Sequence, residues 1–226
     1  MEEPIREIFA NLDNWRHLPN YQLERRFDVF LTPYLLRIVQ AHTNVALDPT
    51  IVPEMPLKQE RTNLSDKADY VLFSADRRTA YLIELKTDCA SIRAEQIAYL
   101  DRCCATPWCQ TLDGLIEVAR ASQQRRKYIH LLSLLARAEQ VRLQPDLLRI
   151  FSSGTAVRLQ TEWVEVVSEV ESVETIFITP TKQDPLRCIS FADIRRVIGS
   201  TRDGLAPYLV EALVAWECEA GTEAPR

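Results

Sequence analysis

The stretch that most constrains what this chain can fold into spans residues 66–88. It holds two apolar, strand-forming runs, 69–73 and 80–86, joined by a polar and charged connection over 74–79. Strand-forming runs separated by a few polar residues are typical of a β-hairpin. We therefore expect an antiparallel pair of strands that other elements of the fold must cover.

Charged side chains stand at the open end of this predicted hairpin. Successive side chains of a strand point to opposite faces, so Glu84 and Lys86 share one face while Ile83 and Leu85 share the other. If the register of the hairpin brings its strand ends together, Asp69 joins Glu84 and Lys86. The pattern then predicts two carboxylates and one ammonium at the mouth of a small sheet.

A cluster of this kind is costly if it serves only the architecture. Two carboxylates a few ångströms apart repel each other, and the pKa of one should rise unless a cation lies between them. Mg²⁺ prefers carboxylate oxygens and keeps waters that a substrate phosphate can replace. Lys86 would then lie beside a metal-bound water, where it can orient the water or offset charge that develops on phosphorus. The alternative is a half-exposed strand on which Glu84 and Lys86 are solvated charges.

The order Asp69, then Glu84-Leu85-Lys86 across a hairpin, resembles the PD-(D/E)XK nuclease superfamily. The signature of that superfamily is an Asp followed at variable spacing by Asp/Glu-x-Lys. Ala68 stands before Asp69, where the signature often has Pro. The resemblance covers roughly residues 20–135, and it implies a restriction-endonuclease-like fold.

The residues that follow the lysine resemble the RecB-like branch of this superfamily. That branch has Glu-x-Lys-Thr and then a Gln and a Tyr on the following helix, and here Thr87, Gln96 and Tyr99 take these places. Gln96 and Tyr99 are closer together in sequence than in that branch, which leaves membership of the branch open.

The resemblance also implies the roles of individual residues. Asp69 and Glu84 would hold Mg²⁺ or Mn²⁺, with the main-chain carbonyl of Leu85 as a further ligand. Lys86 would position or activate the attacking water. Glu24, on the first core helix, matches a further acidic ligand of the superfamily, and Gln96 would support the site. Glu24 reads equally as an ordinary exposed glutamate, and Gln96 reads more readily as a plain surface glutamine.

Local basic clusters supply candidate contacts to nucleic-acid phosphates. The net charge of −5 argues against a protein coated in basic surface, although it leaves room for a local basic groove. A basic pair by itself is more often a solvated surface than a nucleic-acid contact. The candidate nucleic-acid contacts are Arg77, Arg78, Arg125, Arg126, Lys127 and Tyr99, with Arg25-Arg26 as a further basic pair.

Apolar residues recur at helical spacing in several other stretches. The predicted helices span residues 4–16, 20–41, 91–102, 106–121, 145–151, 156–170 and 190–198, and a last helix begins at Pro207. Pro33 should kink or restart the second of these helices, because proline lacks the backbone N–H. Ser91 and the pair Thr106-Pro107 should open the third and the fourth. Further strands are predicted near residues 57–61, 128–135 and 174–179.

This order of elements predicts an α/β fold with a mixed central sheet flanked by helices and a helix-rich C-terminal half. We expect a single domain over residues 1–226, with a core at about 20–135 and an α/β extension at about 136–218. No apolar run is long enough to span a membrane, and no signal peptide opens the chain. The six cysteines lack the paired spacing of a zinc site, so reduced thiols and a cytoplasmic location are expected.

Three classes of function remain after this reading. The first is a Mg²⁺- or Mn²⁺-dependent nuclease that cuts phosphodiester bonds, expected in DNA. The second is a nuclease-fold module that has lost catalysis and binds nucleic acid or a protein partner. The third is an interaction adaptor that binds through its helical C-terminal half. No membrane partner is expected, and a homodimer stays open.

Overall fold

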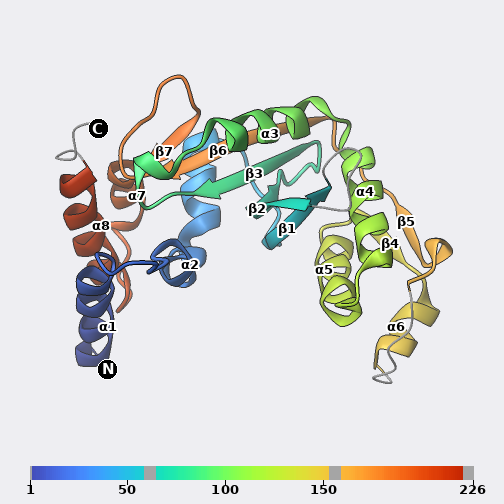
Figure 1. Ribbon diagram of the computed structural model, residues 1–226, viewed down its shortest axis with the longest axis horizontal. Helices are drawn as coiled ribbons and strands as arrows, with labels where there is room; N and C mark the ends of the chain where they lie inside the picture. The colour runs from blue at the N-terminus through green and yellow to red at the C-terminus, as the bar shows by residue number, and fades with distance from the viewer. Residues whose placement is uncertain (1, 59–64, 153–158, 221–226) are drawn as a thin grey trace. The chain divides into compact units, whose positions relative to one another are not determined.

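The computed structural model describes residues 2–58, 65–152 and 159–220 (Figure 1). It is an α/β structure, about 51% helical, with a mixed five-stranded sheet flanked by helices. The strand order in that sheet is β1-β2-β3-β6-β7. The bounds of these strands are Val52–Lys58 for β1, Ser65–Phe73 for β2, Thr79–Leu85 for β3, Ser172–Thr179 for β6 and Cys188–Ser190 for β7. The predicted α/β class with a mixed central sheet flanked by helices is therefore confirmed.

The chain divides into two compact units, and each unit is assembled from segments that are distant in sequence. The first unit contains Met1–Val45, Glu84–Ala94 and Ile176–Arg226. The second unit contains Ala46–Ile83 and Glu95–Thr175. Strands β3 and β6 therefore begin in the second unit and end in the first.

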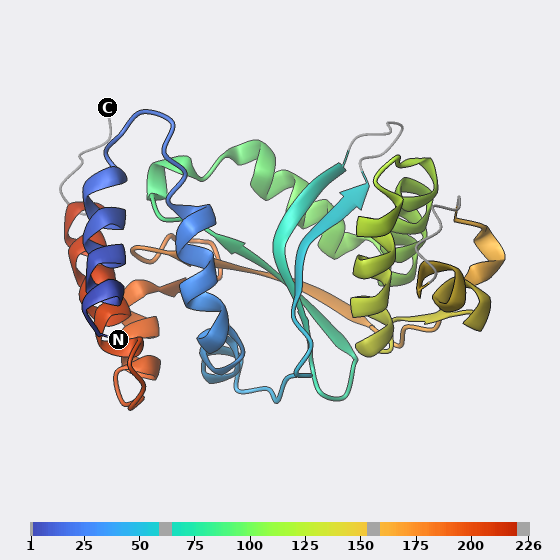
Figure 2. The same ribbon diagram turned by 90° about the horizontal axis from the view of Figure 1, so that it is seen from below.

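Helices form most of the first unit. They are α1 (Glu2–Trp15), α2 (Glu24–Thr43), α7 (Phe191–Ile198) and α8 (Ala206–Ala220), and the short 3-10 helix η1 spans Cys89–Ser91. Helices α1 and α8 lie side by side in both views (Figure 1 and Figure 2). The helices predicted at 4–16, at 190–198 and from Pro207 are confirmed.

An aromatic cluster fills the centre of the first unit. Phe27, Phe191 and Trp216 are completely buried, and the ring of Phe27 lies 5.0 Å from that of Trp216 in an edge-on contact. The indole Nε1 of Trp216 donates a hydrogen bond to the carboxylate of Asp13 at 2.9 Å. Residues from α1, α2, α7 and α8 thus meet in one core, and burial of such large rings is the main stabilising term there.

Helix α2 runs from Glu24 to Thr43 with Pro33 inside it. Of the two expected effects of Pro33, a kink or a restart, the restart does not occur. A proline inside a helix costs about 3 kcal/mol through its missing N–H and its ring. Buried side chains on both sides of Pro33, among them Phe27 and Ile38, offset that cost by packing in the core.

Polar side chains cap the last two helices. The hydroxyl of Ser190 accepts a hydrogen bond from the N–H of Asp193, whose carboxylate accepts one from the N–H of Ser190. This reciprocal capping box starts α7 where the sequence predicts it. Before α8, the carboxylate of Asp203 accepts hydrogen bonds from the N–H groups of Leu205 and Ala206 and from the Tyr34 hydroxyl.

The second unit contains the predicted hairpin. Strands β2 and β3 are antiparallel, with Tyr70 opposite Ile83 and Phe73 opposite Ala80. Strand β1 pairs antiparallel with β2 on the other side. The remaining elements are α3 (Ala94–Ala105), α4 (Trp108–Ala121), α5 (Arg125–Arg137), α6 (Pro145–Ser152), η2 (Thr161–Trp163), β4 (Val141–Leu143) and β5 (Val164–Val166).

Helices α4 and α5 contact β1 within this unit. The side chain of Gln140, which follows α5, is fully buried and hydrogen-bonds several segments around it. The Gln140 side-chain oxygen accepts hydrogen bonds from Trp108 Nε1 at 3.1 Å and from the Ser168 hydroxyl at 2.6 Å. Its amide nitrogen donates to the carbonyl of Ala138 at 3.0 Å. A buried amide with its bonds satisfied in this way fixes the chain without an unpaired polar group.

Two predicted elements are of the wrong type. Residues 128–135 are part of helix α5 and not a strand. The buried positions Ile129, Leu132 and Leu135 recur at helical spacing, and the apolar residues between them hide that period. The helix predicted over 156–170 is also wrong in the part that the structure describes, residues 159–170. Elements η2 and β5 occupy this part, and Val164 and Val166 of β5 pair with β4.

Other errors concern the ends of elements. Strand β1 starts at Val52, earlier than predicted, and residues 59–61 lie outside the described part of the chain. It lies at an edge of its sheet, where the prolines that read as a loop are tolerated. Ser91 ends η1 and does not cap α3, because its hydroxyl bonds the carbonyl of Asp88. Thr106 bonds back to Arg102 and gives α4 no side-chain cap.

Candidate functional site

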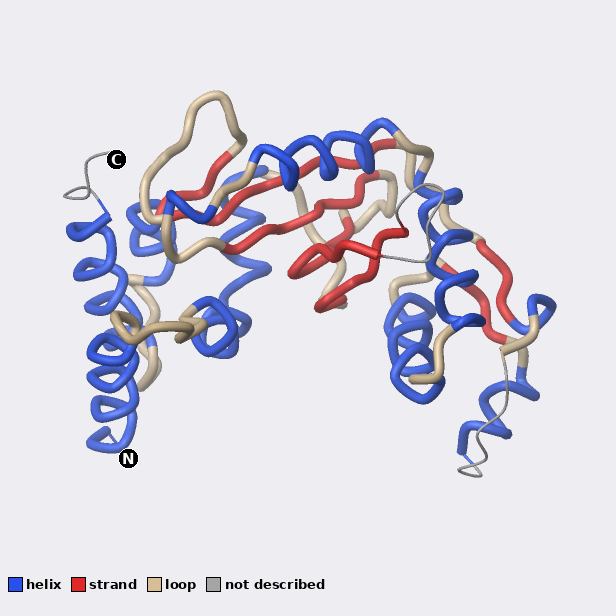
Figure 3. The backbone as a smooth tube through the Cα atoms, viewed as in Figure 1, coloured by secondary structure: helices blue, strands red, loops and turns tan. Residues whose placement is uncertain are grey.

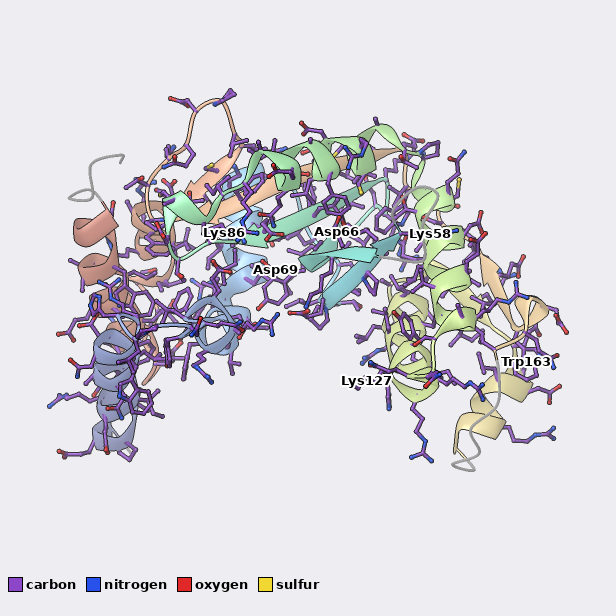
Figure 4. The ribbon with its side chains drawn as sticks, viewed as in Figure 1. Lys58, Asp66, Asp69, Lys86, Lys127 and Trp163 are labelled. Carbon is purple, nitrogen blue, oxygen red and sulfur yellow. The ribbon has the colours of Figure 1, made fainter. Side chains whose placement is uncertain are left out.

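Lys86 is labelled in Figure 4. Its ammonium lies near two glutamates of the first unit. Its Nζ donates a hydrogen bond to Glu84 Oε1 at 2.9 Å and lies 3.6 Å from Glu24 Oε2. Glu84 is 3% exposed and Lys86 is 8% exposed. Three of the candidate residues, Glu24, Glu84 and Lys86, are thus brought together, and we call them the acid–lysine cluster.

The sheet and α2 position this cluster. Glu84 lies in β3 and Lys86 follows it directly, with its backbone N–H bonded to the carbonyl of Ile178 in β6 at 2.8 Å. Side-chain alternation then places Glu84 and Lys86 on one face. Glu24 is the first residue of α2, where the positive end of the helix dipole stabilises a carboxylate.

Burial makes the charges of the cluster depend on one another. An ionised carboxylate that leaves water loses several kcal/mol of solvation unless a counter-ion and hydrogen bonds replace it. Lys86 provides that counter-ion for Glu84. The pair therefore holds a positive group, already stripped of most of its water, beside two carboxylates.

The chemistry of these donors suits a hard divalent cation. The carboxylates of Glu24 and Glu84 and the main-chain carbonyl of Leu85 offer oxygen, which Mg²⁺ and Mn²⁺ prefer. Among the residues that the structure describes, no group of three or more His, Cys, Asp or Glu side chains is placed to hold a metal ion. Mg²⁺ is commonly bound by one or two carboxylates together with waters and substrate phosphates. The donors present fit that mode of binding.

A cavity of about 530 Å³ lies in the same unit and shares Glu24 with the cluster. Thr87 and Asp88, which follow Lys86 in the chain, also line it. Its other lining residues include Arg16, His17, Tyr21, Arg25 and Trp216. The acid–lysine cluster therefore has a polar, partly basic hollow next to one of its members.

The remaining predicted active-site residues belong to the second unit. Asp69 is half-buried on β2, and Gln96 is half-buried on α3. Their roles beside Glu84 stay predictions. Tyr99 on α3 is only 6% exposed, so its ring offers little surface to a nucleobase. Burial also raises the pKa of the Cys103 thiol on the same helix to about 11.

The basic residues predicted to contact nucleic acid have different surroundings. Arg77 forms an ion pair with Glu139, and Arg78 Nη1 lies 2.7 Å from Glu171 Oε1. Both guanidinium groups are therefore partly neutralised. The other predicted basic contacts are Arg125, Arg126 and Lys127 in the first turn of α5, where the last two are exposed. Lys127 is labelled in Figure 4.

Sequence reasoning missed the residues between α1 and α2 that line the cavity. The sequence Trp-Arg-His-Leu-Pro-Asn-Tyr-Gln-Leu-Glu-Arg-Arg over 15–26 mixes aromatic and basic side chains. That mixture, typical of nucleic-acid contacts, was a usable signal. The five cysteines whose side chains are described are all free, and no described helix is long and apolar enough to cross a membrane.

Comparison of the chain with protein-family models, with curated proteins and with solved structures gives no match.

Proposed function

We propose that the protein is a Mg²⁺- or Mn²⁺-dependent nuclease that hydrolyses phosphodiester bonds in DNA. The observation that supports this best is the buried Glu84–Lys86 pair at the end of β3, with Glu24 at the same ammonium. A buried ion pair is often no more stabilising than apolar residues of similar volume. A role in function therefore explains the buried charges of Glu84 and Lys86 better than a role in stability does.

The roles of the residues follow from their chemistry. The metal would be held by Glu84 and the Leu85 carbonyl. The resemblance of the chain to the superfamily implies Asp69 as a further ligand. A bound ion would supply a lowered pKa for its water and neutralisation of charge on the phosphate. Lys86 offers a hydrogen-bond donor to the attacking water or to a phosphate oxygen, in a site with little water to weaken it. Glu24 orients that ammonium from the start of α2.

A cleavage assay tests the proposal. Plasmid and short single- and double-stranded oligonucleotides are incubated with Mg²⁺, with Mn²⁺ and with chelator. We expect cleavage with either metal, none with chelator, and none by Glu84→Gln, which keeps the shape of the side chain. Glu117→Gln, at an exposed ion pair with Lys58 in the second unit, is the matched control and should cut normally. Intact substrate in every metal condition would rule out the nuclease.

A second candidate is a nuclease-fold module without catalysis that binds nucleic acid or a protein partner. One observation favours it: the ammonium of Lys86 already lies beside both Glu84 and Glu24, so each carboxylate has a cation nearby without a metal ion. This candidate predicts binding that is unchanged by chelator and no cleavage with any metal.

A further inference from the structure

The loop that connects α1 to α2 is drawn in tan in Figure 3. Its sequence has side chains with chemistry suited to a nucleic acid. Residues 15–26, which we call the α1–α2 segment, comprise this connection and the adjoining helix ends. Trp15 is 47% exposed and Leu18 is 54% exposed, which is unusual for large apolar side chains. They are surrounded in sequence by the cations Arg16, Arg25 and Arg26.

Hydrogen bonds and ring contacts hold this segment in one conformation. The N–H of Leu18 bonds the carbonyl of Trp15 at 2.9 Å, and the N–H of Tyr21 bonds that of Leu18 at 3.2 Å. The rings of Trp15 and Tyr21 meet edge-on at 6.3 Å. The guanidinium of Arg26 lies 4.9 Å from the centre of the Tyr21 ring. Because the aromatic groups are already ordered, a ligand would not have to order them on binding.

The same segment lines the cavity beside the acid–lysine cluster. Its volume of about 530 Å³ is within the range usual for ligand sites, about 300–1,000 Å³. The Tyr21 hydroxyl is buried and has no hydrogen-bond partner within residues 2–58, 65–152 and 159–220. A buried polar atom at a cavity wall is a ready contact for a polar ligand.

We propose that the α1–α2 segment binds single-stranded nucleic acid, with a base stacked on Trp15 and a backbone phosphate at Arg25, which is exposed and lines the cavity. An exposed aromatic face can stack an unpaired base, whereas the bases of a duplex already stack on one another. Arginines beside the aromatic groups supply the charge that tracks a single-stranded backbone. Binding of the strand does not depend on the proposed nuclease function. Delivery of the strand to the acid–lysine cluster rests on that proposed function.

Binding is measured in chelator, so that no metal-dependent cleavage interferes. The probes are a labelled 20-residue oligothymidylate and a blunt duplex of the same length, each followed by fluorescence anisotropy. We expect the single strand to bind at least tenfold more tightly than the duplex. Trp15→Ala should weaken single-strand binding by about 5- to 100-fold, the range for loss of one base–aromatic stack.

Further variants separate stacking from folding and from general charge. Trp15→Phe keeps an aromatic face and should recover most of the affinity lost in Trp15→Ala. Arg25→Ala should weaken binding and reduce the slope of log K against log salt by about 0.7. Val29→Ala, at an exposed apolar position of α2, and Arg149→Ala, at an exposed arginine of α6, are the matched controls and should bind normally.

The outcomes distinguish this inference from the proposed function. Single-strand binding that depends on Trp15, without cleavage in any metal, supports the inference and removes only the nuclease. Cleavage of duplex with no preference for single strands overturns the inference and leaves the nuclease standing. Normal binding by Trp15→Ala and Arg25→Ala overturns the inference whatever the cleavage result, and would point to a protein partner at Trp15 and Leu18.

Discussion

At the scale of single residues, Lys86 is the side chain on which the proposed chemistry depends most. Lys86→Ala removes the only ammonium of the acid–lysine cluster. The rate of cleavage should fall by roughly 10²-fold or more, the scale of a positioned group that transfers a proton or stabilises charge. Nucleic-acid affinity should stay close to normal, because other basic residues would make the phosphate contacts under the proposed function. Rates come from single-turnover cleavage and affinities from anisotropy in chelator.

Two controls accompany this substitution. Lys67→Ala removes an exposed ammonium that pairs with Glu54, and it should cut at the parent rate. Lys86→Gln keeps a hydrogen-bond donor toward Glu84, and it serves if the alanine variant is too unstable to assay. An equal loss of binding and cleavage would make Lys86 an ordinary phosphate contact.

Asp69 is the residue whose proposed role a metal titration tests. A metal that binds only the folded protein stabilises it by about 2.7 kcal/mol at a hundredfold excess over the dissociation constant. We expect Mn²⁺ to raise the melting temperature of the parent and to raise that of Asp69→Asn much less. Asp66→Asn, which changes a half-buried carboxylate of the same strand, is the control and should respond like the parent. Equal responses in all three proteins would remove Asp69 from the metal site.

At the scale of elements, the start of α8 should give stability that depends on pH. The N–H of Ala206 and the Tyr34 hydroxyl both bond the charged form of Asp203, which holds the pKa of that carboxyl below its usual range. Because the folded pKa is lowered, the stabilisation is present above the unfolded pKa of about 3.9 and is lost as the pH falls toward the folded value.

Replacing Asp203 with alanine should therefore destabilise the protein by about 0.5–2 kcal/mol at pH 7, the usual cost of a lost N-cap. The difference from the parent should shrink below about pH 4, because the carboxyl of Asp203 then takes up a proton in the unfolded parent while it still holds its charge in the folded parent. Urea unfolding at pH 7 and pH 3 measures both values. Asp101→Ala on the exposed face of α3 should match the parent at both, and a constant difference for Asp203→Ala would contradict the capping role.

The buried amide of Gln140 should be the most sensitive polar position of the second unit. Gln140→Leu keeps much of the volume but leaves Trp108 Nε1–H without its acceptor. A buried donor left unsatisfied costs about 1–3 kcal/mol. Gln144→Leu, at an exposed position, is the control and should change the free energy of unfolding little. Equal urea midpoints for the two variants would show that the hydrogen bonds of Gln140 contribute nothing.

At this scale, the sequence predicts the elements that are determined by residues close together in the chain. It does not predict features that depend on packing between distant segments. The hairpin of β2 and β3 follows from two apolar runs and a short polar connection, and alternation along β3 pairs Glu84 with Lys86. Residues 128–135 were mistaken for a strand because their nearly continuous apolar run fits either period. The cavity could not be predicted, since it forms where the α1–α2 segment packs near Trp216, and no local pattern encodes that meeting.

At the scale of the whole molecule, the interleaving of the two units makes the first unit depend on the end of the chain. A chain ending at residue 175 lacks Phe191 and Trp216, the aromatic neighbours of Phe27. In that truncated chain we expect the amides of α2 to lose protection from hydrogen exchange, while those of α4 keep more of theirs. Helix α4 contacts β1, which the truncated chain retains. A chain ending at residue 220, which keeps α8, is the control. Protected α2 amides in the shorter chain would contradict the prediction.

The division of the chain into two interleaved units also limits which gene fragments can be exchanged by recombination without breaking up the acid–lysine cluster. The shortest continuous stretch that contains the whole second unit runs from residue 46 to 175, and it carries Glu84 and Lys86 with it. Glu24 stays outside that stretch. A gene fragment exchanged at these boundaries would therefore separate the lysine from one of its two glutamates, and the recipient would have to supply a matching carboxylate at the start of its own helix. Recombination can move the acid–lysine cluster intact only by moving residues 24–86 as one block.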